Sequence, residues 1–211
     1  GSYQDIDLYD NVPYNDWQDL TFGRTGHTFN HSLNISGGSE KLTYAFSYSH
    51  VNDKAIMQHS SFKRDNFSLK LKSKPSKNVT LDYSIRYSDT DINGAGANDA
   101  NSVYDSDKRL KYAVIYTPIP ISNLTSAAGS GDDDLGNLYH PLDAISDNAQ
   151  KKTRRNLNMS GSLTWEVIKN LKLRAELGLD SYRNKDNRYW GLTTYYIDNV
   201  PQGINQGKPA I

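Results

Sequence analysis

Apolar and polar side chains alternate with a period of two over several stretches of this sequence, and the alternation does not slip within a stretch. Such a period predicts β-strands with two unlike faces. We therefore predict an all-β chain with six strands. Their apolar residues are Phe29, Leu33 and Ile35; Leu42, Tyr44, Phe46 and Tyr48; Phe67, Leu69 and Leu71; Val79, Leu81, Tyr83, Ile85 and Tyr87; Leu157, Met159, Leu163, Trp165 and Val167; and Leu171, Leu173, Ala175, Leu177 and Leu179.

The connections between these strands fall into two classes. Three are tight and rich in turn-forming residues, at Gly37–Glu40, Lys74–Lys77 and Ile168–Asn170, which is typical of β-hairpins. The other two are longer, one around Val51–Ser61 and one from Asp89 to Lys152. Short and long connections alternate along the chain. We therefore expect antiparallel up-and-down strands, with all short turns at one end of the sheet and all long loops at the other.

This pattern divides the chain into segments. Within the long connection, residues 107–117 contain an apolar segment that lacks clean alternation and runs into Pro118 and Pro120. Proline removes a backbone donor that a strand needs, so we predict a short helix or an irregular packed segment there and no further strand. The expected segments are a loop at 1–26, four strands in 27–88, a long loop at 89–152, two strands in 153–184 and a loop at 185–211.

Composition excludes several classes of function. The 24 basic and 24 acidic residues balance, and neither sign forms a run in the sequence longer than Asp132–Asp134, so we expect no nucleic-acid partner. No hydrolase, nucleotide-binding or dinucleotide-binding motif is present, the His residues lack ligand spacing and Cys is absent, so we expect no enzyme, no cofactor and no metal site. Asp132–Asp134 with Asn137 offers oxygen ligands for Ca²⁺ but lacks EF-hand spacing, and a solvated acidic loop is the favoured interpretation.

Alternation permits two architectures. In a soluble sandwich the apolar faces pack on a second sheet; in a transmembrane β-barrel they face lipid and the polar faces line a wet lumen. The strands are long enough to cross a bilayer, and Tyr48, Tyr87, Trp165 and Tyr182 stand where an interfacial aromatic girdle is expected, which favours the barrel. Since the smallest single-chain membrane barrels use about eight strands, six strands predict part of a larger barrel.

The order of several short motifs resembles the barrel of SusC/RagA-type TonB-dependent transporters. The most specific part is Ser36–Lys41 (SGGSEK) with Asp16-Trp17 about twenty residues before it. Further parts of the resemblance are Tyr14–Trp17, Gly23–Gly26, His31–Lys41 with Tyr44, Phe62–Arg64, Pro118–Pro120 and Trp165–Lys172. The resemblance covers nearly the whole chain.

This resemblance implies an importer in the bacterial outer membrane of Bacteroidetes type, with a barrel of about 22 strands around a plug. It also implies a SusD-like surface lipoprotein as a lid, energy from the TonB system, outer-membrane lipid around the barrel and uptake of glycans or of peptides. No plug domain, TonB-contacting segment or closing strands are recognisable, so we expect a fragment of the transporter. A soluble all-β module that binds carbohydrate or protein remains the alternative.

Candidate binding residues follow from the expected loops. Aromatic rings there can stack on a sugar or contact the lid lipoprotein. The candidates are Trp17, Tyr104, Tyr139, Tyr189, Trp190, Tyr195 and Tyr196. Charged residues of the polar parity are expected to face the lumen or the plug; they are Lys70, Lys72, Arg86, Arg174 and Glu176.

Overall fold

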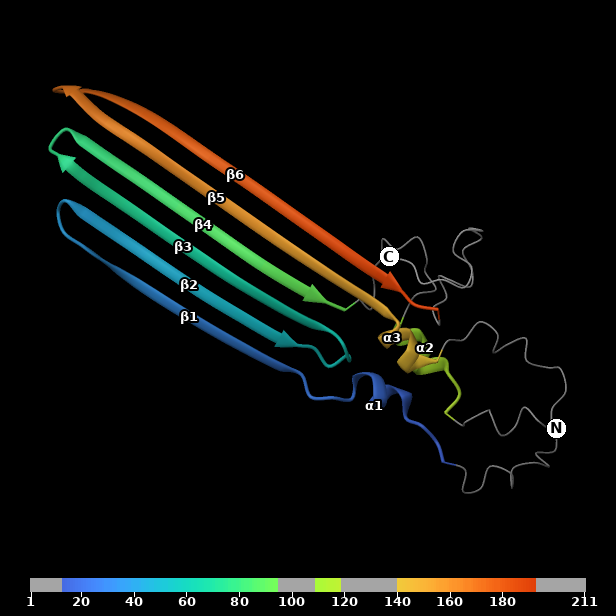
Figure 1. The fold of residues 1–211 in the computed structure, drawn as a ribbon. Coiled ribbons are helices and arrows are strands. Elements are labelled where there is room, and N and C mark those ends of the chain that lie inside the picture. The colour runs from blue at the N-terminus through green and yellow to red at the C-terminus, as the bar shows by residue number, and fades with distance from the viewer. Residues whose placement is uncertain (1–12, 95–108, 119–139, 193–211) are drawn as a thin grey trace, which may run out of the picture.

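The computed structural model describes residues 13–94, 109–118 and 140–192. They form one antiparallel sheet in which the order of the six strands follows the sequence, and Figure 1 shows the strands side by side with three short helices at one end. The strands are β1 (His27–Gly38), β2 (Leu42–Lys54), β3 (Ser61–Ser76), β4 (Val79–Asn93), β5 (Asn148–Ile168) and β6 (Leu171–Trp190). The predicted all-β, up-and-down fold is confirmed.

The hairpin turns gather at one end of the sheet, which we call the turn end (Figure 1). In the first hairpin, a Cβ at Gly38 would collide with the Leu42 carbonyl oxygen, so the close approach of the two strands requires glycine. In the last hairpin, Asn170 has a φ of 69°. Asparagine tolerates this left-handed conformation better than most residues do.

The strands extend further towards the opposite end, the loop end, than alternation predicted. β4 continues past Ser88 to Asn93, and β5 begins at Asn148 rather than near residue 153. The ladder remains regular there, with Asn93 opposite Lys151. Alternation ended early because both faces of the sheet become polar at this level, while the backbone pairing does not depend on side-chain polarity.

Three short helices lie at the loop end (Figure 1). They are α1 (Trp17–Phe22), α2 (Arg109–Ile115) and α3 (Pro141–Ser146), and α2 falls within the segment assigned to a short helix or irregular packing. Arg24 ties the residues after α1 to the β2–β3 connection, because its guanidinium donates to the carbonyl oxygens of Ala55 and Met57 at 2.8 and 2.6 Å. No described helix is both long and apolar enough to cross a bilayer.

The buried apolar residues of the described chain all lie at this loop end. They are Trp17, Met57, Tyr112, Ala113 and Ile145. Together with the three helices and residues 55–60 they form what we call the capping cluster. Its core is small and local, and the sheet contributes none of these side chains.

Candidate functional site

Strand register sorts the side chains of the sheet into two faces. Residues opposite each other in neighbouring strands point to the same side, and successive residues along a strand point to opposite sides. Phe46 lies between Ile35 and Leu69, and Ile85 between Leu69 and Met159. The predicted apolar residues therefore share one surface, the apolar face. The residues between them form the polar face.

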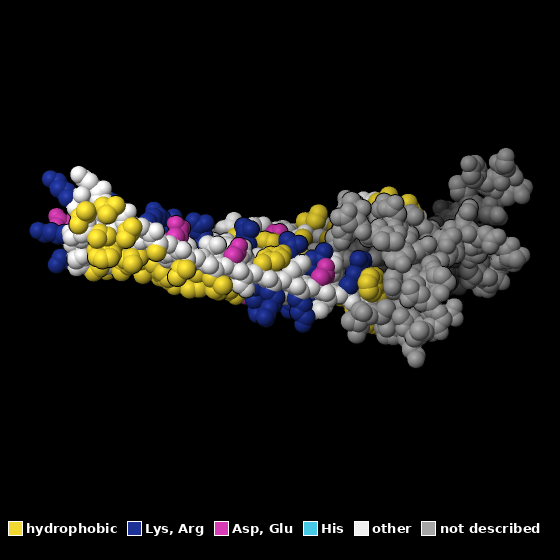
Figure 2. All heavy atoms as spheres, turned by 90° about the horizontal axis from the view of Figure 1, so that it is seen from above, with side chains coloured by type: hydrophobic (Ala, Val, Ile, Leu, Met, Phe, Trp, Pro, Cys, Tyr) yellow, Lys and Arg dark blue, Asp and Glu magenta, His cyan; other side chains and the backbone are white. Residues whose placement is uncertain are grey.

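The apolar face is not covered by protein in the described part of the chain. Leu177 is 82% exposed, and Leu173 and Leu179 are more than half exposed. Figure 2, which looks onto the β6 edge, shows hydrophobic side chains gathered along one side of the sheet. A water-soluble sandwich would bury this surface against a second sheet, and the described residues provide no such sheet.

The apolar side chains stop at the same level on β2, β3, β4 and β5, whereas β1 has one further apolar residue, Phe29, beyond it. The last apolar row consists of Leu33, Tyr48, Phe67, Tyr87 and Leu157, with Ser181 on β6. The next row on the same face consists of His31, His50, Asp65, Asp89, Arg155 and Arg183. We call the surface on the turn side of this boundary the apolar band and the surface on its loop side the charged belt.

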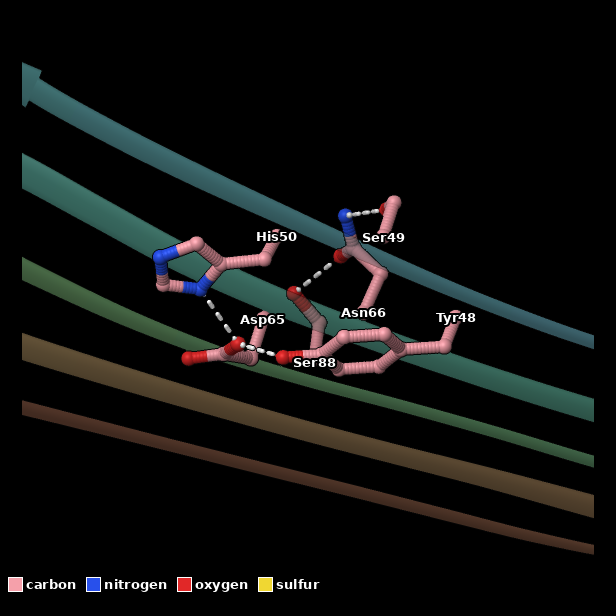
Figure 3. A network of polar contacts seen from close by, with 6 residues as sticks. All are labelled: Tyr48, Ser49, His50, Asp65, Asn66 and Ser88. Carbon is pink, nitrogen blue, oxygen red and sulfur yellow. Dashed lines mark hydrogen bonds and ion pairs between the residues drawn. The ribbon is translucent and has the colours of Figure 1, made fainter. Parts of the chain in front are cut away.

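Tyrosines at the boundary direct their hydroxyl groups into the charged belt. Tyr48 donates to Asp65 at 2.7 Å, and the same carboxylate oxygen lies 2.7 Å from Nδ1 of His50; Figure 3 shows both side chains reaching Asp65. On β4, Tyr87 reaches Asp89 at 3.3 Å. Each ring thus joins the apolar band while its hydroxyl joins the belt, the amphipathic placement typical of interfacial tyrosines.

The aromatic boundary differs in two ways from the expected one. Tyr48 and Tyr87 lie inside β2 and β4 rather than at their ends, because these strands continue beyond the apolar band. The placement of Tyr182 in the girdle was wrong, because it stands opposite Asn156 on the polar face. Trp165 does lie on the apolar face, next to Val79 and Leu173 near the turn end.

The polar face is held together by side-chain pairs across the strands. The Asn66 amide donates to Ser49 and accepts from Ser88, at 3.1 and 2.8 Å, on the opposite side of the sheet from Asp65 (Figure 3). Three ion pairs lie on this face. They are Lys72 with Asp82 at 3.9 Å, Arg174 with Glu176 at 3.3 Å and Lys152 with Asp186 at 3.5 Å.

A pocket of about 330 Å³ lies at the loop end, where β4, β5 and β6 meet α3. Asn93, Gln150, Arg188 and Tyr189 are among its lining residues. The Gln150 amide donates to Asp186 at 2.9 Å on the polar face. Tyr189 lies on the other side of the sheet, with Asn93 and Lys151, and an aromatic ring beside such polar groups can bind a polar ligand that also has an apolar surface.

The structure separates the predicted aromatic candidates. Tyr189 lines the pocket. Trp190, the next residue, points to the polar face of the sheet, where the Arg188 guanidinium lies 4.9 Å from its ring centroid. Trp17 is buried in the capping cluster, where its indole N–H donates to Thr117 at 2.7 Å and its ring contacts Tyr116 and His140 edge to face. These contacts leave little of the Trp17 ring for stacking on a ligand.

The remaining candidates lie outside the described residues. They are Tyr104, Tyr139, Tyr195 and Tyr196, together with the acidic loop at Asp132–Asp134. Within the ranges that the structure describes, no group of His, Asp and Glu side chains is arranged to hold a metal ion.

Sequence reasoning missed the charged belt as a surface of its own. Residues such as Asp89 and Arg155 have the same parity as the apolar residues that precede or follow them. Reading that parity beyond the last apolar residue would have placed both on the apolar face. Their direct contact, with Arg155 Nε 3.3 Å from an Asp89 carboxylate oxygen, depends on the strand register.

Comparison with solved structures places this sheet in a known architecture. The chain superposes on part of "the RagAB peptide importer in the 'closed-closed' state" with a TM-score of 0.61, 16% identity and 87% of this chain covered. A second structure, "the RagAB peptide transporter", gives a TM-score of 0.60, 16% identity and 89% coverage. The match spans 21% and 22% of those chains, or about a fifth of their length.

These matches, at 16% identity, show a shared fold. Neither a protein-family profile nor a curated protein matches the sequence.

Proposed function

We propose that this chain is a barrel segment of a SusC-like, TonB-dependent importer in the bacterial outer membrane. The observation that carries the proposal is the common level at which the apolar band ends, from β2 through β5. A surface made for a soluble partner has no physical reason to change from apolar to charged along one line across a whole sheet. A bilayer imposes such a line, because its hydrocarbon ends at one depth.

The height of the apolar band agrees with this proposal. On β5 the band runs from Leu157 to Trp165, which is about 27 Å along a strand at ~3.4 Å per residue. A tilt of about 40° reduces this to roughly 21 Å across a membrane, and outer-membrane barrels have an apolar band about 25 Å tall. Ile168, 63% exposed at the turn, extends the band further.

The edges of the sheet support a segment of a larger barrel. β1 and β6 each pair on one side only among the described strands. Unpaired backbone groups are costly in hydrocarbon, where no water can replace the missing partner. In our proposal further strands of the importer pair with both edges, the polar face lines the lumen, and the long loops face the cell exterior.

Site-directed spin labelling of the protein in lipid bilayers tests this placement. The chain contains no Cys, so single labels can be introduced at Leu177→Cys and at its neighbour Glu176→Cys. A label at 177 should be relaxed by oxygen, which partitions into hydrocarbon, and a label at 176 by a water-soluble nickel chelate. The contrast should repeat with a period of two from 173 to 180.

Two outcomes would contradict the proposal. Equal access of the nickel chelate to both labels in bilayers would mean that the apolar face lies in water. Fully folded, monodisperse protein without detergent would favour the alternative, a soluble all-β module that binds carbohydrate or protein.

We propose that the imported substrate is an oligosaccharide or a peptide and that a SusD-like lipoprotein closes the loop end. The resemblance in sequence and the likeness to a peptide importer support this choice of substrate classes. Among the described candidates, Tyr189 lines the pocket and its side chain is partly accessible; it lies at the loop end on the belt side of the sheet.

Calorimetric titration of the purified protein with mixed oligopeptides and with oligosaccharides tests this part. Tyr189→Ala should weaken binding of the true class about tenfold, a typical loss for an aromatic anchor. Tyr182→Ala is the matched control, because Tyr182 is exposed on the same strand but lies away from the pocket. Equal losses in both variants would remove the pocket from the proposal.

A further inference from the structure

The charged belt is not uniform along the sheet. On β2 and β3 its one carboxylate at the boundary, Asp65, is held by Tyr48 and His50. On β5 and β6 the belt carries only basic charges, and the neighbouring carboxylates are Asp89 and Asp91 on β4, which contact Arg155 and Thr153. The basic residues are Lys151, Arg155, Arg183 and Lys185, and we call them the basic patch.

Arg183 and Lys185 have no acidic partner among the described residues. The nearby carboxylate of Asp186 has the opposite parity, and it binds Gln150 and Lys152 on the polar face. Figure 2 shows Lys and Arg side chains standing on the same side of the sheet as the hydrophobic ones, immediately beyond them towards the loop end. Uncompensated basic charge beside an apolar surface favours an anionic ligand with an apolar part.

The same two strands contain a hollow in the apolar band. It measures about 640 Å³ and centres on Gly161, which leaves space between Tyr83 and Leu177. A Cβ at Gly161 would come no closer than 3.6 Å to Tyr83, so the missing side chain is not required by packing. Leu163 and Leu179 are among the other apolar lining residues.

The spacing between the basic patch and the hollow fits one lipid molecule. Gly161 lies six residues from Arg155 along β5, or about 20 Å at ~3.4 Å per residue. With a strand tilt of about 40°, this is roughly 15 Å of depth, the thickness of one leaflet in a hydrocarbon core of ~30 Å. A headgroup at the patch would therefore place an acyl chain at the hollow.

We propose that β5 and β6 form a binding site for a membrane lipid with a phosphorylated headgroup. The phosphate contacts Arg183 and Lys185, with Arg155 and Lys151 beside it, and one acyl chain fills the hollow at Gly161. Arginine and lysine are the side chains that bind phosphate most strongly. This inference rests on the proposed membrane placement, and the loop end then faces the outer leaflet.

Native mass spectrometry of the detergent-solubilised protein, titrated with diphosphoryl lipid A, tests the site. Wild-type protein should retain one lipid, and the double variant Arg183→Gln/Lys185→Gln should bind it about thirtyfold more weakly, as expected for two lost basic contacts near a membrane surface. The double variant Arg154→Gln/Lys172→Gln removes the same charge from the polar face of the same strands and should bind like wild type.

Two further measurements distinguish binding of a lipid from binding of a free anion. Dephosphorylated lipid A should not be retained, and inorganic phosphate should not displace the bound lipid. Gly161→Leu fills the hollow and should weaken lipid binding while leaving the fold unchanged by circular dichroism. Displacement by inorganic phosphate, or equal binding to both double variants, would overturn the site.

The spin-label contrast between positions 176 and 177 keeps the two proposals distinguishable. If that contrast is present and no lipid is retained, the lipid site is wrong and the barrel placement stands. If the contrast is absent, the barrel placement fails and the lipid site fails with it.

Discussion

The capping cluster and the apolar band bury their apolar side chains in opposite ways. In the cluster, Trp17, Tyr112 and Ile145 are enclosed by protein. In the band, Leu173, Leu177 and Leu179 point away from the protein altogether. The cluster is stabilised by the ordinary hydrophobic effect in water, whereas in our proposal lipid removes the band from water. Substitutions in the two regions should therefore respond differently to the surrounding medium.

The largest expected effect is in the capping cluster. Trp17→Ala removes a buried ring and its hydrogen bond to Thr117, and such a truncation costs about 3–5 kcal/mol. The loss should be the same in detergent and in bilayers, because the cluster lies outside the apolar band. Hydrogen exchange of the α1 and α3 amides measures it.

Tyr14→Ala is the control for that variant, because this ring lies in the same segment and is 77% exposed. It should leave the exchange rates nearly unchanged. Similar acceleration by both substitutions would mean that burial of Trp17 does not stabilise the cluster.

The second-largest effect is a loss of stability that we expect in the apolar band and not in the capping cluster. Leu177→Arg places a charge on the apolar face, and we expect it to lower the free energy of unfolding in bilayers by about 2–4 kcal/mol, the cost of Arg near the midplane of a membrane barrel. Denaturant titration in lipid vesicles measures this change. The exchange rates of the capping cluster should not respond.

Gly178→Arg adds the same charge one residue further, on the polar face, where a new Cβ comes no closer than 3.9 Å to its nearest neighbour, the Met159 carbonyl oxygen. It should be tolerated. If both arginines destabilise equally, the two faces do not differ in their surroundings and the comparison with the capping cluster fails.

A smaller effect is expected at the turn end, the part of the sheet farthest from the capping cluster. Asn170→Ala puts a Cβ-bearing residue without a helpful polar side chain at a φ of 69°, at a cost of about 1 kcal/mol. Asn170→Gly should be neutral or slightly stabilising. Unfolding of the β5–β6 hairpin in lipid vesicles, followed by hydrogen exchange, measures the difference; an equal loss in both variants would contradict the backbone explanation.

The smallest effect tests the boundary between the band and the charged belt. Tyr48→Phe deletes the hydroxyl that donates to Asp65, and we expect a loss of about 0.5–1 kcal/mol for an exposed hydrogen bond. Tyr44→Phe, on the same face of β2 and inside the band, should have less effect. Vesicle denaturation compares the two, and a larger loss at 44 would place the boundary elsewhere.

Much of the fold follows from local pattern. Val79 to Tyr87 alternates so cleanly that strand, face and approximate length can be predicted, and Gly38 and Asn170 mark turns that their backbone needs. The sequence analysis was incomplete or wrong about side-chain placement where it did not follow, or did not have, an alternation pattern. Tyr182 was assigned by residue type although its parity puts it on the polar face, and no local pattern indicated that the ring of Trp17 is buried in the capping cluster.

The sequence alone determined the two-faced strands, the order of turns and loops and the all-β class, because side-chain direction in a strand has a period of two whatever the strand pairs with. Only the tertiary structure decided which residues of different strands lie side by side across the sheet. The common end of the apolar band, the Asp89–Arg155 contact and the basic patch all depend on the register between strands. Register is set by pairing between residues far apart in the chain, such as Asn93 and Lys151 across a long connection, and no local pattern contains it.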